Sequence, residues 1–149
     1  MRTRLLAAAV AATALGSAAP AVDAQPRAMH PAGAKIIAHS SRYGTVIFTG
    51  QNRSIYLFAR DRGKSSCYAA CAKAWPPVLT TGKPRAGAGV RAKLLGTVRR
   101  SDGTRQVTYN GHPLYHFVND KKPGQITCQN VSQFGAKWLV VNPAGQAVH

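Results

Sequence analysis

Short apolar-rich runs separated by turn residues dominate this chain, and this pattern is typical of a β-protein. Residues 105–109 and 113–118 form two such runs, and Asn110-Gly111 between them is the strongest hairpin signal that a sequence offers. Ser101-Asp102-Gly103 is a second turn, which joins the run at 96–100 to the same hairpin. Residues 96–118 therefore predict a three-stranded meander.

An earlier part of the chain repeats this plan. Residues 45–49 lead into the turn Gly50-Gln51-Asn52-Arg53, and the chain returns through 54–59, which predicts another hairpin. Residues 35–40 are expected to form a first strand and 136–141 a closing strand.

A helix is expected between the two hairpin regions. Residues 65–74 are rich in Ala and other small residues and contain neither Gly nor Pro. Trp75-Pro76-Pro77 ends this segment, because proline cannot continue a helix. The Gly- and Pro-containing residues 80–90 are expected to form a connecting loop. The predicted fold class is mainly β, with two tandem β-hairpin/meander repeats and one short helix between them.

The core is expected to come from apolar residues of these segments. They are Ile36, Ile37, Val46, Ile47, Phe48, Ile55, Leu57, Phe58, Trp75, Trp138, Leu139 and Val140.

One motif, Tyr-x-Phe-x-x-Asp, occurs twice, 59 positions apart. Strand periodicity places the Tyr and Phe of each copy on one face, with the Asp just past the strand end. There a carboxylate can accept hydrogen bonds from backbone amides and fix the turn. This structural interpretation is favoured over a ligand or metal site that contains both aspartates. The motif residues are Tyr56, Phe58 and Asp61 in the first copy and Tyr115, Phe117 and Asp120 in the second.

The N-terminal residues have the features of an export signal. A basic start precedes the apolar run 5–19, and Val22-Asp23-Ala24 offers small residues to a signal peptidase. The run is shorter than the roughly 20 residues of a permanent anchor. No cysteine occurs before Cys67, so N-terminal lipidation is not expected. The chain is therefore expected to be secreted or periplasmic, with a cleaved signal and no transmembrane anchor.

The predicted organisation is a signal peptide at 1–24, an N-terminal segment at 25–41 and a single domain at 42–149. This domain contains two pseudo-repeats, 42–80 and 96–145, joined by a loop rich in Gly, Pro and basic residues.

Positive charge is the main feature of the composition. The chain has 20 Lys and Arg against four acidic residues, a formal net charge of +16, and all four acids are Asp. Removal of residues 1–24 leaves 18 basic and three acidic residues. Such a charge attracts anionic envelope polymers or lipid headgroups, although it can equally serve only solubility. The densest basic stretch, 83–105, contains no aromatic residue, so specific nucleic-acid binding is not expected.

The cysteines allow two interpretations. Cys67 and Cys71 are four positions apart, and on a helix their Cα atoms lie within the range of a disulfide. A disulfide between them is favoured and leaves Cys128 free. The alternative is a copper-like metal or redox site in which both thiolates join a histidine. The candidate histidines are His112, His116 and His149.

An enzyme is not expected. The chain has no Glu, and the only plausible carboxylate pair, Asp61 and Asp120, is flanked by cations that favour the ionised form. No nucleophile elbow, phosphate loop or zinc-protease helix is present, and no cofactor is expected. The sequence therefore favours an exported, non-catalytic, strongly basic envelope-associated or binding module. The alternative is a periplasmic copper-like or redox protein that uses Cys67, Cys71 and a histidine.

Taken together, these segments resemble a bacterial family of secreted repeats, described as predicted lipoproteins with a Tyr-x-(Phe/Trp/Tyr)-x-x-Asp motif. The resemblance covers about residues 42–145 and depends on IYLFARD, SSCYAACAKAWPPV, DGTRQVTYNGHPLYHFVND and KPGQ. It implies export and a repeat architecture, and the family has no characterised function. The lipidated cysteine of its lipoprotein members is missing here. Cys128 lies in a segment that is usually glycine-rich in the family.

Overall fold

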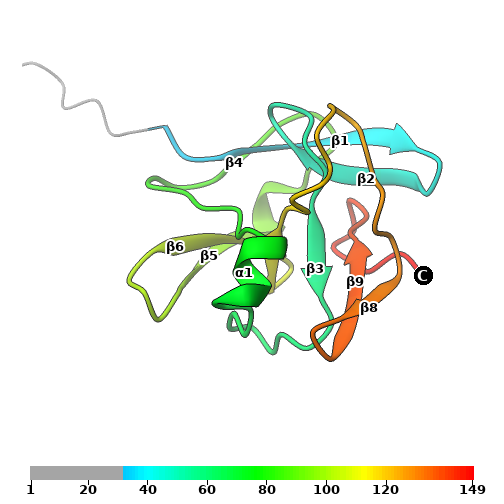
Figure 1. Cartoon of the computed structure of the whole chain (residues 1–149). Helices are drawn as coiled ribbons and strands as arrows, with labels where there is room; N and C mark the ends of the chain where they lie inside the picture. The colour runs from blue at the N-terminus through cyan, green and yellow to red at the C-terminus, as the bar shows by residue number, and fades with distance from the viewer. Residues whose placement is uncertain (1–31) are drawn as a thin grey trace, which may run out of the picture.

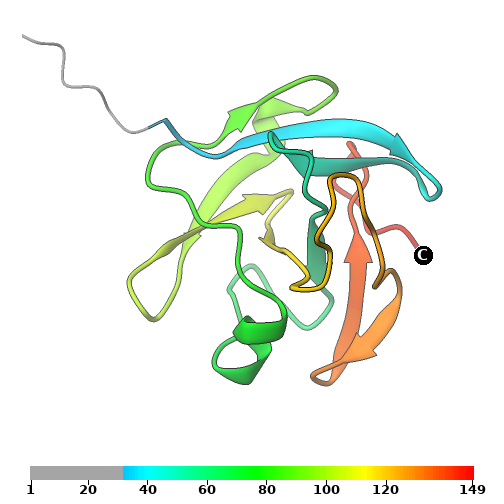
Figure 2. The same ribbon diagram turned by 45° about the horizontal axis from the view of Figure 1, so that its top comes forward.

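Two β-sheets make up the computed structural model, which describes residues 32–149. The smaller sheet has the strand order β2-β1-β4 and the larger one β5-β6-β7-β3-β9-β8. The hairpin of β1 and β2 lies across one end of the larger sheet (Figures 1 and 2). The strands are β1 (Lys35–Ser41), β2 (Gly44–Thr49), β3 (Tyr56–Phe58), β4 (Arg85–Ala86), β5 (Leu95–Arg99), β6 (Arg105–Tyr109), β7 (His112–Tyr115), β8 (Val131–Gln133) and β9 (Ala136–Val140). The helices are α1 (Ala70–Ala74) and the 3-10 helix η1 (Ala92–Leu94).

The predicted fold class is confirmed, since the structure is mainly β with one short α-helix between the two repeat regions. The meander β5-β6-β7 forms as expected, and Asn110 and Gly111 at its second turn have φ angles of 49° and 78°. Two positive φ angles in succession are the requirement of a tight hairpin turn. The predicted signal peptide and its cleavage site lie outside the described residues.

The predicted first hairpin is wrong in its pairing. Strand β2 pairs with β1, whereas β3 pairs with β7 and β9 in the other sheet. Only one bridge, between Phe48 and Ser54, links the two runs. Periodicity could not identify the partner, because both faces of β3 are buried and apolar.

The predicted helix at 65–74 is also too long. Asp61 accepts hydrogen bonds from the backbone N–H and the hydroxyl of Ser66, and Ala69 has a φ of 48°. Helical geometry therefore begins only at Ala70. The loop expected at 80–90 contains the short strand β4, which pairs with β1, and β8 was not predicted.

Alternate residues of the strands fill two hydrophobic clusters. One cluster contains Tyr56 and Phe58, and the other contains Ile55 and Leu57. All the predicted core residues are buried except Ile37, which is partly buried. A strand that is covered on both faces reads as a continuous apolar run, and this explains IYLF.

The two repeats interleave rather than fold side by side. Tyr56 of β3 pairs directly with Tyr115 of β7. On its other side Tyr56 pairs with Val140, and Tyr115 forms a bridge with Pro77. Each motif tyrosine therefore lies between the motif tyrosine of the other repeat and a residue that closely follows the buried tryptophan of the other repeat, Val140 after Trp138 or Pro77 after Trp75. The larger sheet is thus built from strands of both repeats.

Candidate functional site

The motif tyrosines and aspartates form two crossed hydrogen bonds at the centre of the protein. Tyr56 donates its hydroxyl to Oδ2 of Asp120 at 2.6 Å, and Tyr115 donates to Oδ2 of Asp61, also at 2.6 Å. All four side chains are buried. Each tyrosine thus bonds the aspartate of the other repeat, a pairing that the spacing within one motif does not reveal.

The other oxygen of each carboxylate fixes the turn that follows it. Oδ1 of Asp61 accepts hydrogen bonds from the backbone N–H and the hydroxyl of Ser66 at 2.8 and 2.6 Å. Oδ1 of Asp120 accepts the same pair from Thr127 at 3.1 and 2.5 Å. Ser54 adds a further bond to Oδ2 of Asp120 at 2.6 Å. Both carboxylates are saturated by protein donors, which is the arrangement that the structural interpretation of the motif expects.

Hydroxyls and amides, rather than cations, are therefore the partners of these two acids. Among residues 32–149 the one ion pair joins Arg100 to Asp102, with 3.7 Å between Nε and Oδ2. The cations that flank Asp61 and Asp120 in the sequence are exposed.

Burial and the neighbouring carboxylates raise the pKa of both motif tyrosines. Burial is the larger cause for each, and the hydrogen bond to Asp120 or Asp61 adds to it. The phenolate form would bring a second negative charge beside an aspartate in a dry environment. Both tyrosines therefore keep their protons at alkaline pH.

We expect the free energy of unfolding to fall as the pH rises above about 10, the ordinary pKa of tyrosine. Above that pH the unfolded chain releases protons that folded Tyr56 and Tyr115 retain, so each tyrosine contributes a slope of about 1.4 kcal/mol per pH unit. Urea unfolding of the wild type and of Tyr56→Phe between pH 9 and 11 measures the slope. The slope of Tyr56→Phe should be smaller by the contribution of one tyrosine. A slope equal to that of the wild type would contradict a raised pKa for Tyr56.

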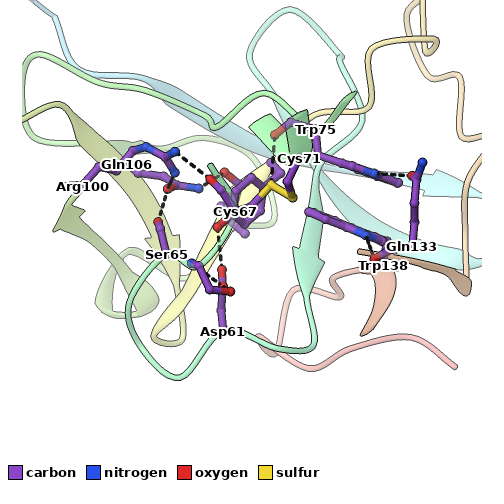
Figure 3. Close-up of a disulfide and its surroundings, with 12 residues drawn as sticks. Asp61, Ser65, Cys67, Cys71, Trp75, Arg100, Gln106, Gln133 and Trp138 are labelled. Atoms are coloured by element: carbon purple, nitrogen blue, oxygen red, sulfur yellow. Dashed lines mark hydrogen bonds between the residues drawn. A yellow bond between two sulfur atoms is a disulfide. The ribbon is translucent and has the colours of Figure 1, made fainter. Parts of the chain in front are cut away.

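Aromatic rings from both repeats form a column beside this network. Trp138 stacks on Phe58 with ring centroids 4.2 Å apart and on Trp75 at 4.0 Å, and Trp75 in turn lies against Phe117 at 4.6 Å. Gln133 holds the central pair: its side-chain oxygen accepts from Trp75 Nε1 and its backbone oxygen from Trp138 Nε1. Figure 3 shows the two indole rings nearly parallel with Gln133 beside them. Thus Phe58 and Phe117 of the motif end a stack that is made by both repeats.

A disulfide joins Cys67 to Cys71, as favoured from the sequence (Figure 3). The buried Arg100 holds this segment against the meander. Its Nη2 donates to the backbone oxygen of Cys67 at 2.8 Å, and its Nη1 donates to Oε1 of Gln106 at 2.8 Å. The guanidinium also lies 4.3 Å from the ring centroid of Tyr68.

Cys128 is the free cysteine of the described part of the chain. Cys128 follows Thr127 in the sequence, just as Cys67 follows Ser66. Thr127 donates hydrogen bonds to Asp120 in the same way as Ser66 donates to Asp61. Cys128 therefore occupies the place in the second repeat that a disulfide cysteine occupies in the first. Partial burial raises the pKa of its thiol, which makes it a weak nucleophile.

The residues proposed for a metal site are not assembled in residues 32–149, where no group of three or more His, Cys, Asp or Glu could hold an ion. The disulfide occupies both thiols that a copper site needs. Nδ1 of His116 lies 2.9 Å from the backbone oxygen of Ser54, and His112 pairs with Tyr109 in the β6–β7 hairpin. His149 is exposed at the C-terminal residue.

A groove of about 770 Å³ lies where the two sheets meet. Residues of β1 and β4 line one part of it, and the turn before β6 lines another. The segment 78–81, which runs between the sheets, contributes further lining residues. No local sequence pattern reveals this groove, because its walls come from segments far apart in the chain.

The basic residues that line the groove are Lys35, Arg85 and Arg105, and none of the lining residues within 32–149 is acidic. All three are exposed. His116 also lines the groove, and burial lowers its pKa, so this imidazole is neutral at pH 7. The groove therefore combines three exposed cations with a neutral imidazole.

Comparison with family models finds a match over residues 38–79 and again over 96–142, to a family described as a secreted repeat of unknown function. The chain belongs to this family. Each matched segment of the secreted-repeat family contains one copy of the motif and, after it, one buried tryptophan, Trp75 in the first segment and Trp138 in the second. Comparison with curated proteins and with solved structures finds no match. Within residues 32–149, no helix is long and apolar enough to cross a membrane.

Proposed function

We propose that this secreted-repeat protein is an exported, non-catalytic module that binds anionic polymers of the cell envelope through its basic surface. The observation that carries this proposal is the imbalance of charge at the surface. Every Lys and Arg in residues 32–149 is exposed except Arg100. Two of the three aspartates there are buried and accept from hydroxyl and amide donors, so they form no ion pair with the surface cations. An uncompensated field of this kind concentrates polyanions at the surface.

A polymer fits better than a bilayer surface, because the basic residues include three that line a groove rather than a flat face. A groove accommodates a chain or a part of one, whereas lipid headgroups present a plane. The protein acts outside the cytoplasm, in the periplasm or beyond, after removal of its signal peptide.

Calorimetric titration with a polyuronate and with inorganic polyphosphate tests this proposal. Binding should be clear at about 20 mM salt and fall at least tenfold by about 200 mM, because the screening length shortens from about 20 Å to about 7 Å. Failure of both polymers to bind at the lower salt concentration would refute it. Titration with anionic phospholipid vesicles is the companion measurement, and tighter binding to vesicles than to either polymer would also count against it.

The copper-like alternative gains no observation in its favour. Its two thiols are joined in the disulfide, and its candidate histidines lie in other parts of the described structure.

A further inference from the structure

The groove between the sheets has the dimensions of a ligand site. Its volume of about 770 Å³ falls within the roughly 300–1,000 Å³ of small-molecule sites. Gly33 closes one side tightly: a Cβ atom at this position would lie 1.9 Å from the backbone oxygen of Lys83. The wall there is therefore backbone packed on backbone.

Three cations converge on this groove from different strands. Lys35 and Arg85 are direct partners in the parallel pairing of β1 with β4, and Arg105 begins β6. Nε of Arg85 donates to the backbone oxygen of Gly33 at 3.3 Å, which anchors the guanidinium at the groove. No carboxylate in residues 32–149 forms an ion pair with any of the three. Such a cluster is suited to an anionic group on a ligand.

The other lining groups are suited to hydroxyls. Nδ1 of His116 lies beside a backbone oxygen, which can only accept, so Nδ1 carries the proton and Nε2 is left as an acceptor. The interior phosphates of a polyphosphate chain carry no hydrogen at pH 7 to offer such an acceptor, whereas a sugar unit carries hydroxyls. Gln51 and Thr81 also line the groove and can exchange hydrogen bonds with hydroxyls.

The apolar part of the groove is aliphatic. Leu79 is 48% exposed and lines the groove together with Val78, and no Phe, Tyr or Trp of the described residues lines it. Nucleobases are normally bound by stacking on aromatic rings, so this lining disfavours a nucleotide.

We infer that this groove binds a unit of an acidic polysaccharide, with the carboxylate or phosphate of the sugar at Lys35, Arg85 and Arg105 and its hydroxyls at Gln51 and His116. This inference rests on the proposed function and deepens it. The basic surface then attracts anionic polymers in general, and the groove selects those whose units carry both an anionic group and hydroxyls.

A charge-matched pair of double variants tests the inference. Arg85→Gln/Arg105→Gln removes two positive charges from the groove, and Lys121→Gln/Lys122→Gln removes two from an exposed turn outside it. Both variants keep the same net charge, and circular dichroism checks that both fold. Each is titrated at low salt with an oligogalacturonate, a glycerol-phosphate oligomer, inorganic polyphosphate and neutral maltohexaose.

We expect the groove variant to lose about thirtyfold in affinity for the better of the two hydroxyl-bearing anions, and the control to lose less than about threefold. The preferred oligomer identifies carboxylate or phosphate as the anionic group. Equal losses in both variants would overturn the groove as the site and leave the proposed function standing. A groove-dependent loss for polyphosphate as large as that for the oligosaccharide would overturn the sugar as the ligand. No binding of any anion to the wild type would instead refute the proposed function.

A second arm separates the hydroxyl contacts from charge. His116→Phe leaves the net charge at pH 7 unchanged and removes the acceptor Nε2, so it should weaken the oligosaccharide and leave polyphosphate unaffected. Equal effects on the two ligands would count against a hydroxyl at His116.

Discussion

Asp120→Ala is expected to lower the free energy of unfolding by about 4 kcal/mol, because it leaves buried donors without an acceptor. The carboxylate of Asp120 accepts from the hydroxyls of Ser54 and Tyr56 and from the N–H and hydroxyl of Thr127. These groups come from both repeats, so the loss acts on the sheet and on the turn together. Equilibrium unfolding in urea, followed by tryptophan fluorescence, measures the change.

Asp102→Ala is the matched control. Asp102 has a side chain that is 53% exposed, and it bonds only within its own turn and weakly to Arg100. Its removal should lower the stability far less than Asp120→Ala does, because hydrogen bonds of an exposed carboxylate compete with water. Equal stability of Asp120→Ala and Asp102→Ala would contradict the structural role of Asp120. If Asp120→Ala had wild-type stability and no longer bound the polymer, Asp120 would belong to a ligand site instead.

A double-mutant cycle tests the crossing of the repeats. Tyr56→Phe combined with Asp120→Asn should show a coupling free energy of about 1–2 kcal/mol. Tyr56→Phe combined with Asp61→Asn should be additive, although those two residues share a motif. Coupling within the motif and none across the repeats would contradict the structure.

Local signals predicted the meander of the second repeat well. Asn110-Gly111 and Ser101-Asp102-Gly103 determine turns through their own backbone preferences, so the meander follows from short stretches of sequence. The motif predicted a strand that contains both aromatic residues, with the acid just past its end. This is right for Tyr56 and Phe58 in β3 but wrong for the second copy, where β7 ends at Tyr115 and Phe117 lies beyond it. Asp61 and Asp120 both bond the turns that follow them.

Contacts between distant residues could not be predicted in the same way. Tyr56 was placed on the correct strand, but its partner lies 64 residues away, and nothing near it in the sequence identifies that partner. The predicted pairing of the first hairpin is wrong for the same reason. Every residue of β3 is buried, so the pattern fits several neighbours equally well. The groove likewise depends on Lys35 and Arg105 coming together from different sheets.

The interleaving gives the doubled motif a physical explanation. A single repeat would leave its motif tyrosine without an aspartate as hydrogen-bond acceptor. It would also leave that tyrosine without the neighbouring segment that follows the tryptophan of the other repeat. Two copies satisfy each other across the pair Tyr56–Tyr115. The smallest structure that buries all of these groups therefore contains two repeats, and here both come from one chain.

Trp138→Ala is expected to lower the free energy of unfolding by about 4 kcal/mol, because it leaves a cavity in the middle of the aromatic column. Trp138 is fully buried, stacks on Phe58 and Trp75, and meets the edge of Tyr115 with ring centroids 5.2 Å apart. The near-ultraviolet circular dichroism of the two stacked indoles should collapse in the same variant. Urea unfolding and the near-ultraviolet spectrum measure the two effects.

Phe134→Ala is the control, since Phe134 is 37% exposed at the β8–β9 turn, and its loss should cost less than about 1 kcal/mol. Trp138→Phe keeps a ring in the column and removes the hydrogen bond to Gln133, so it should retain part of the stability and remain measurable if Trp138→Ala does not fold. Because Trp138 belongs to the second repeat and Trp75 to the first, unfolding should stay a single transition in every folded variant. Separate transitions for the two halves would show that the column does not couple the repeats.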